Sequence, residues 1–169
     1  MKRIVLSSML LILAVITARA GDGDTYVSLD AGLMYEKTLN STLTFEKELK
    51  YNDAWAIFFE VGDKWQIHDG EDGCGKACKE VFWKNYFWQG GALYKKTLNK
   101  YKNSFLRLDV GADAGGYRGS FTFGLQLHLE YNMVLSNGIQ LVFAQRNEVH
   151  FSHGDTFRNG LSVGLKFPL

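Results

Sequence analysis

The sequence predicts an all-β protein, an eight-stranded, antiparallel, up-and-down transmembrane β-barrel with a plugged polar interior. Two observations lead to this fold class. Residues 121–133, FTFGLQLHLEYNM, alternate without interruption between apolar and polar side chains, which is the period of a strand with two unlike faces. The same alternation recurs from Thr25 onward, divided by turn-like residues. We expect strands at about residues 25–36, 41–51, 54–66, 80–96, 104–116, 120–133, 138–151 and 156–168.

The N-terminus has the three parts of a secretory signal peptide. Met1 is followed by two basic residues, by an apolar run from Ile4 to Thr17 and by a small-residue site that ends at Ala20. The apolar run is too short to span a bilayer comfortably. We therefore expect residues 1–20 to be removed and residues 21–169 to form one barrel domain. No cysteine stands at the cleavage point, which argues against a lipid-anchored N-terminus.

The rest of the chain restricts the class of protein further. It has no second apolar stretch of spanning length, so a closed barrel is the remaining way to cross a membrane. The chain carries 19 basic and 18 acidic residues without a basic stripe, which argues against direct binding of nucleic acid. Its single proline, Pro168, interrupts no strand interior.

Most of the expected strands show one clearly apolar face. The fourth strand, VFWKNYFWQGGALYKK, alternates poorly, and we expect a bulge or a misplaced strand boundary near Gly90 and Gly91. The apolar positions are Val27, Leu29, Ala31, Leu33 and Tyr35 on the first strand, Trp55, Ile57, Phe59 and Val61 on the third, Leu106, Leu108, Val110, Ala112 and Ala114 on the fifth, and Leu161, Val163, Leu165 and Phe167 on the last.

The opposite face combines charged residues with glycines. Glycine weakens a strand that faces solvent, but it makes room inside a narrow barrel for long charged side chains. We therefore expect the polar face to line the interior and the apolar face to contact outer-membrane lipid. The charged members are Asp30, Glu46, Glu48, Glu60, Lys64, Arg107, Asp109, Asp113, Glu130, Arg146, Glu148, Arg158 and Lys166; the glycines are Gly32, Gly62, Gly111, Gly124, Gly160 and Gly164.

A soluble barrel of lipocalin type, with the alternation turned inside out around a ligand cavity, is the competing interpretation. It accounts for the signal peptide equally well. It leaves unexplained both the glycines of the polar face and the aromatic residues near the strand ends, which suit the two aromatic girdles of a membrane barrel.

The polar face also predicts a network of ion pairs. Unpaired charges are costly in a confined interior, so each inward arginine is expected to meet a carboxylate. Eight strands leave an interior that side chains can fill, so we expect no steady water channel. The predicted network consists of Arg107, Arg146 and Arg158 with Asp109, Glu130 and Glu148.

The two cysteines lie four positions apart in the glycine-rich loop after the third strand. In an exported protein, Cys74 and Cys78 are expected to form a small disulfide. A metal site with His68 and Asp72 is the alternative, although the spacing matches no common zinc motif. We expect no cofactor. With both termini on the periplasmic side, this loop faces outward, where barrels carry their longer loops.

Residues 90–167 resemble the C-terminal region of the conjugative transposon TraO proteins of Bacteroidota. The shared pattern is a paired-glycine strand, a strand that ends in Ala-Gly-Gly-Tyr, a Glu-Tyr before a short turn, an arginine midway along the next strand and a final Val-Gly-Leu-Lys-Phe. The resemblance implies a non-enzymatic component of a conjugative DNA-transfer apparatus in the outer membrane of a Gram-negative bacterium. Such a protein would act through loop or rim contacts with other conjugation proteins.

Two other functions stay open. The His-x-Ser of His150 and Ser152 resembles the pair used by lipid A deacylases, which are also eight-stranded outer-membrane barrels. A serine nucleophile also needs a carboxylate to orient its base, yet residues 156–169 contain none, and Asp155 is the substitute at hand. His150 and Ser152 also share the parity of the interior. The third possibility is a structural or adhesive small barrel of the OmpA/OmpX type.

Overall fold

The computed structural model describes residues 23–35, 38–64, 86–117, 119–136, 138–151 and 156–169. These residues form eight strands and one short 3-10 turn, η1, between the second and third strands. The signal peptide, the Cys74–Cys78 disulfide and Ser152 are predictions that lie outside the described residues. The elements are β1 (Thr25–Met34), β2 (Thr38–Glu48), η1 (Lys50–Asn52), β3 (Ala54–Lys64), β4 (Tyr86–Tyr101), β5 (Ser104–Tyr117), β6 (Ser120–Val134), β7 (Gln140–His150) and β8 (Phe157–Pro168).

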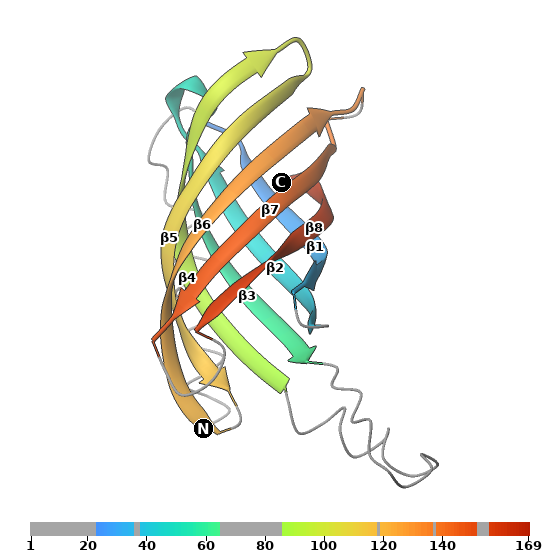
Figure 1. The fold of residues 1–169 in the computed structure, drawn as a ribbon. Coiled ribbons are helices and arrows are strands. Elements are labelled where there is room, and N and C mark those ends of the chain that lie inside the picture. Colours follow the sequence, from blue (N-terminus) through green and yellow to red (C-terminus); the bar gives the residue numbers. More distant parts are fainter. Residues whose placement is uncertain (1–22, 36–37, 65–85, 118, 137, 152–155) are drawn as a thin grey trace, which may run out of the picture.

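The strands form a closed antiparallel barrel in which each pairs with its neighbours in the sequence and β8 closes on β1 (Figure 1). The barrel is staggered. Paired residues can be followed around the wall from Thr25 on β1 to Asn159 on β8. The backbone neighbour of Asn159 is Tyr35, which directly follows β1 and lies ten residues beyond Thr25. For eight strands, this stagger requires a tilt of about 40° from the barrel axis. The predicted fold class is confirmed.

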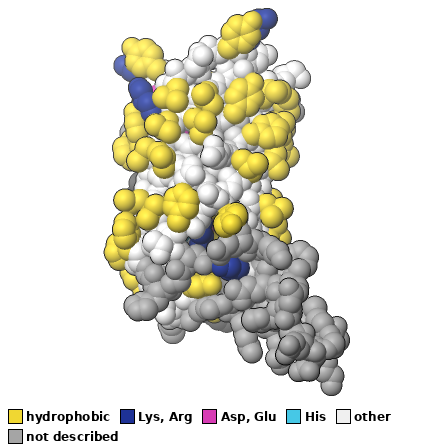
Figure 2. Space-filling view, in the orientation of Figure 1, with side chains coloured by type: hydrophobic (Ala, Val, Ile, Leu, Met, Phe, Trp, Pro, Cys, Tyr) yellow, Lys and Arg dark blue, Asp and Glu magenta, His cyan; other side chains and the backbone are white. Residues whose placement is uncertain are grey.

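The two faces of each strand differ as the alternation requires. On β6, Phe121 is 72% exposed, whereas Gln126 is 2% exposed and lies inside the barrel. Figure 2 shows hydrophobic side chains spread over the outer wall. The buried side chains of the described residues are mostly polar or charged, and the small buried apolar cluster contains Ala56, Phe58 and Leu93. The interior is therefore polar and the wall apolar, which excludes the inside-out barrel.

Strand β4 differs from its prediction. It continues to Tyr101 instead of ending near residue 96, and its pairing with β5 is irregular between Thr97 and Asn99. Gly90 and Gly91 pair regularly with both neighbouring strands, so neither a bulge nor a strand boundary lies there. The alternation had been hidden because two large apolar residues, Phe87 and Leu93, point into the barrel.

Within the described residues, no helix is both long and apolar enough to cross a membrane.

Candidate functional site

The interior of the barrel is the most chemically distinctive part of the molecule. Because successive side chains of a strand point to opposite faces, every strand contributes alternate residues to the lumen. The buried charges form two groups. The three-cation cluster consists of Lys95, Arg107 and Lys166 with Glu46 and Glu130, and the Arg146 cluster consists of Arg146, Glu60 and Glu148.

In the three-cation cluster, two carboxylates are shared by three cations. Glu46 Oε2 lies 3.1 Å from Lys95 Nζ and 2.9 Å from Lys166 Nζ, and Glu46 Oε1 accepts a 2.6 Å hydrogen bond from Arg107 Nη1. Glu130, across the lumen on β6, accepts hydrogen bonds from Lys95 and, at 3.2 Å, from Lys166. Each carboxylate therefore keeps other cationic partners when any single cation is removed.

Arg107 connects this cluster to the turn that contains η1. Its Nη2 donates to Glu48 Oε1 at 3.1 Å, and its Nε donates to the carbonyl oxygen of Asn52 at 2.9 Å. The guanidinium also lies over the ring of Phe105, 4.5 Å from its centroid. These contacts hold the η1 turn against the lumen at the end of the barrel where β1 begins and β8 ends.

The Arg146 cluster has one cation between two carboxylates. Arg146 Nη2 donates to Glu60 and, at 2.9 Å, to Glu148 Oε1, while Nη1 donates to Thr42 Oγ1 at 2.7 Å. Each carboxylate also accepts a hydrogen bond from a side-chain amide. Asn40 donates to Glu60 at 2.7 Å, and Gln89 donates to Glu148 at 3.2 Å. Glu60 and Glu148 are fully buried, so this geometry depends on Arg146.

His150 lies inside the barrel beside the Arg146 cluster. Its side chain is 2% exposed, with Nε2 3.2 Å from Glu148 Oε2 and Nδ1 3.7 Å from Asp113 Oδ1. This inward position of His150 agrees with the alternation of the sequence, which places His150 on the polar face. A His–carboxylate pair is present, but the ring faces the lumen and not the outer wall. Ser152 and Asp155 lie outside the described residues.

The structure brings most of the predicted network together. Arg107 Nη1 lies 3.7 Å from Glu130, and Arg146 binds Glu148. Asp109 lies 3.6 Å from Lys95. Lys95 is absent from the predicted network because it belongs to the fourth strand, whose alternation is irregular in the sequence. Treating Phe87 and Leu93 as inward residues would have placed Lys95, at the same parity, in the lumen.

Arg158 is the exception to the predicted pairing. In the described part of the chain, it forms no ion pair, and its guanidinium lies over the rings of Phe87 and Tyr117, 4.3 Å and 5.5 Å from their centroids. Glu148, its cross-strand neighbour, binds Arg146 instead. Among the described residues, the close contacts of Arg158 are therefore aromatic rings, which bind a guanidinium through cation–π interactions.

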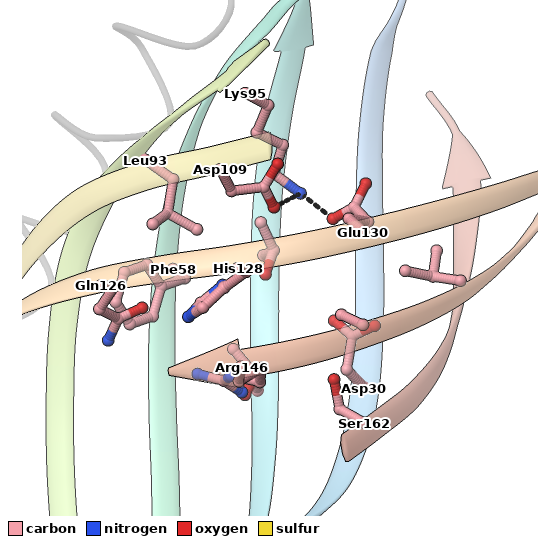
Figure 3. Close-up of a pocket in the computed structure, with 14 residues that line it drawn as sticks. Asp30, Phe58, Leu93, Lys95, Asp109, Gln126, His128, Glu130, Arg146 and Ser162 are labelled. Atoms are coloured by element: carbon pink, nitrogen blue, oxygen red, sulfur yellow. Dashed lines mark hydrogen bonds and ion pairs between the residues drawn. The ribbon is translucent and has the colours of Figure 1, made fainter. Parts of the chain in front are cut away.

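A small cavity of about 30 Å³ separates the two clusters (Figure 3). Its lining includes Asp30, His128 and Arg146, and in Figure 3 Lys95 points from its edge toward Asp109 and Glu130. The volume suits one or two water molecules, and the unbonded His128 Nε2 and Arg146 Nε face polar surroundings that water can satisfy. It is too small for an organic ligand. Among the described residues, no group of three or more His, Cys, Asp or Glu is placed to hold a metal ion.

Comparisons with known proteins support the fold. The sequence matches no protein-family profile, and no curated protein matches it. A major outer membrane protein from Thermus thermophilus is similar in structure, with a TM-score of 0.64 and 11% identity over 87% of this chain and 99% of that one. The outer membrane enzyme PagL has a TM-score of 0.55 and 9% identity over 85% of this chain and 99% of its own.

A de novo designed transmembrane β-barrel is also similar, with a TM-score of 0.51 and 7% identity over 89% of this chain and 98% of that one. Identities this low establish a shared architecture and no shared activity. Together with the apolar wall and the polar lumen, they show that the chain has the fold of an eight-stranded outer-membrane β-barrel.

Proposed function

We propose that the protein is a non-conducting, non-enzymatic barrel of the outer membrane that acts through contacts at its two ends. One observation carries this proposal: the lumen is filled by the three-cation cluster and the Arg146 cluster, with about 30 Å³ left between them. Moving an ion or solute through the barrel would require these buried pairs to separate, which is costly. The water-exposed surfaces that remain for contacts with other proteins are the loops and the rims.

Planar bilayers test the plugged lumen directly. The purified protein should give no discrete conductance steps at moderate voltage, whereas a porin inserted in parallel should. Regular single-channel steps from the wild-type protein would contradict the proposal.

The rim at the end where β1 begins offers a defined contact surface. Two of its turns carry a tyrosine beside a lysine: Lys50 and Tyr51 in η1, and Tyr101 and Lys102 where β4 ends. Tyr51 is 86% exposed and has φ of 64°, an unusual conformation for a bulky residue. Strained, exposed aromatic residues are concentrated at functional surfaces, so Tyr51 is our first candidate for a partner contact.

The resemblance of residues 90–167 to TraO proteins supports a finer proposal, that the partners of this rim belong to a conjugative DNA-transfer apparatus. Mating assays test it. Deletion of the gene from a donor should reduce transfer, and the wild-type gene should restore it. Undiminished transfer by the deletion strain would contradict this role.

Replacement of Tyr51 by glycine sharpens the same test. Glycine accepts a positive φ without strain, so Tyr51→Gly should leave the thermal midpoint of the barrel unchanged or slightly raised. We expect transfer to fall in this variant if the tyrosine side chain contacts a partner. Full transfer with Tyr51→Gly would exclude Tyr51 as the contact.

The close approach of His150 to Glu148 and Asp113 keeps lipid A deacylation as a second candidate. The burial of the ring inside the lumen argues against it, since a lipid ester approaches from the wall or the rim. Mass spectrometry of lipid A after expression distinguishes the two functions. Unchanged acylation would remove the enzyme candidate, and loss of one acyl chain would replace our proposal.

A further inference from the structure

The apolar wall of the barrel is interrupted by a short row of amides. On the outward face of β7, Gln145 and Asn147 lie between apolar residues on both sides, Phe143 toward one end and Val149 toward the other. Asn147 pairs across the strands with Asn159 of β8. With a strand tilt of about 40°, the three amides fall within about 8 Å of one another in height. The amide row, Gln145, Asn147 and Asn159, thus runs from the middle of the wall at Gln145 toward the end of the barrel where β8 begins.

These amides are poorly satisfied by the barrel itself. The side chain of Asn147 donates to the carbonyl oxygen of Leu127 at 3.3 Å. The side chains of Gln145 and Asn159 form no hydrogen bond with any residue that the structure describes. Acyl chains offer neither donors nor acceptors, so amides that face lipid at this depth are unfavourable. A polar row inside a lipid-facing wall is therefore best explained by a partner that supplies hydrogen bonds.

The wall beside the amide row is also shaped differently from a smooth barrel. A shallow, open hollow of about 410 Å³ extends over β7, β8, β1 and β2, where small residues such as Ala31 and Ser41 leave room between leucines. Leu161 stands between the hollow and Asn159 on β8 and is 69% exposed. A protruding leucine beside a hollow allows two copies of the same surface to interlock.

We propose that the wall formed by β7, β8 and β1 is a self-association surface, on which a second copy of this chain docks within the membrane. Two copies inserted in the same direction are related by a two-fold axis along the membrane normal, so each residue meets partner residues at its own height. The amide row of one copy therefore meets the amide row of the other. Each amide both donates and accepts, which makes the row complementary to itself. Hydrogen bonds between polar side chains are a known source of association in membranes.

The test measures association in lipid vesicles. The mature full-length protein, labelled at its N-terminus with donor or acceptor dyes, is reconstituted at a series of protein-to-lipid ratios, and energy transfer between copies is recorded. The wild-type protein should show transfer that rises with the ratio and saturates as a dimer. The triple variant Gln145→Leu, Asn147→Leu and Asn159→Leu should associate at least about tenfold more weakly.

A stability measurement separates this role from a structural one. If the amides serve a partner, the triple variant replaces polar groups on the wall by apolar ones, and its thermal midpoint should stay equal or rise. Both proteins are melted in dilute detergent, where the copies are separate and dimerisation does not stabilise the wild type. The matched control changes the opposite wall, Val61→Leu with Val110→Leu, and should associate as the wild type does.

Three results would overturn the proposal. The first is a wild-type protein that stays monomeric at every protein-to-lipid ratio. The second is association that the triple variant leaves unchanged, or that the control weakens as much. The third is a triple variant that unfolds at a lower temperature than the wild type, because the amides would then stabilise the barrel itself.

Discussion

The two charge clusters of the lumen both neutralise buried carboxylates, but they differ in the number of cations that each carboxylate contacts. In the three-cation cluster, Glu46 and Glu130 are each shared by several cations. In the Arg146 cluster, one guanidinium holds two fully buried carboxylates. The difference indicates that loss of a single charge should be tolerated in the first cluster and not in the second, although both fill the lumen.

Arg146→Met is expected to have the largest effect. The substitution keeps most of the volume but leaves Glu60 and Glu148 facing each other without a cation. Leaving a buried charge without its partner typically costs about 3–5 kcal/mol. We expect the free energy of unfolding in detergent to fall by this amount, measured by urea titration, while planar bilayers still show no conductance.

A rescue variant tests the cause of that loss. Combining Arg146→Met with Glu60→Gln and Glu148→Gln removes the uncompensated charges, so part of the stability should return. If this rescue variant is no more stable than Arg146→Met alone, the loss comes from packing and not from unpaired charges. The two clusters would then not differ in their tolerance to the loss of one charge.

The apolar packing between the clusters should be nearly as sensitive as Arg146. Gly91 faces the lumen, and a Cβ atom there would clash first with the backbone carbonyl oxygen of Ala112 and would lie 2.8 Å from the ring of Phe58 and 2.9 Å from the Cα atom of Asp113. The neighbouring Gly90 has its nearest atom, the carbonyl oxygen of Phe58, at 3.5 Å, which is an ordinary contact. We expect Gly91→Ala to lose about 2–3 kcal/mol by overpacking and Gly90→Ala to lose little. Equal unfolding midpoints for the two variants would show that the lumen has room to relax.

These residues also show what the sequence could and could not predict. Alternation was enough for the strand count and for placing Arg107 and Arg146 on the polar face, because it depends only on the geometry of a strand. The glycines of that face indicated that it lines the interior. The partners were harder to predict, because they are chosen across the lumen. Glu46 on β2 and Glu130 on β6 share the same cations only because of the stagger of the whole barrel.

Two features of the lumen that the sequence did not predict have the same physical origin. The predicted network left out Lys95 and did not include ring contacts for Arg158, because the inward apolar residues Phe87 and Leu93 of β4 broke the simple rule of apolar outside and polar inside. Phe87 hid the parity of its strand and also supplied the ring on which Arg158 lies. A narrow lumen can hold an aromatic ring as a cation partner, and strand periodicity alone does not reveal it.

Lys166→Met should have a smaller effect than Arg146→Met. Glu46 keeps Lys95 and Arg107 as partners, and Glu130 keeps Lys95. The apolar stem of methionine also replaces much of the lysine side chain. We expect a loss of about 1–2 kcal/mol in the same urea titration. A loss equal to that of Arg146→Met would show that the three-cation cluster has no redundancy and would remove the contrast between the two clusters.

The smallest effect is expected at the rim, where a carboxylate is held outside the lumen. Burial alone would raise the pKa of Asp53, but hydrogen bonds from Lys96 Nζ at 2.7 Å, from the Thr97 N–H at 2.9 Å and from the Tyr94 hydroxyl at 3.1 Å outweigh it, so its pKa lies below the ordinary value. A lowered pKa stabilises the folded state above the unfolded pKa of about 4, and that stabilisation is lost as the pH falls through the folded value.

Asp53→Asn should therefore lower the unfolding midpoint slightly at pH 7, and the gap to the wild type should close as the pH falls below about 4. Lys96 is exposed, so the ion pair itself contributes little. The main loss should come from the hydrogen bond that the Thr97 N–H donates, which weakens when its acceptor becomes a neutral amide oxygen. Raising the salt concentration should leave the gap at pH 7 nearly unchanged. If the gap disappears in high salt, the effect comes from the charge of Lys96 instead. This ion pair would then be screened by salt, unlike the buried ion pairs of the lumen.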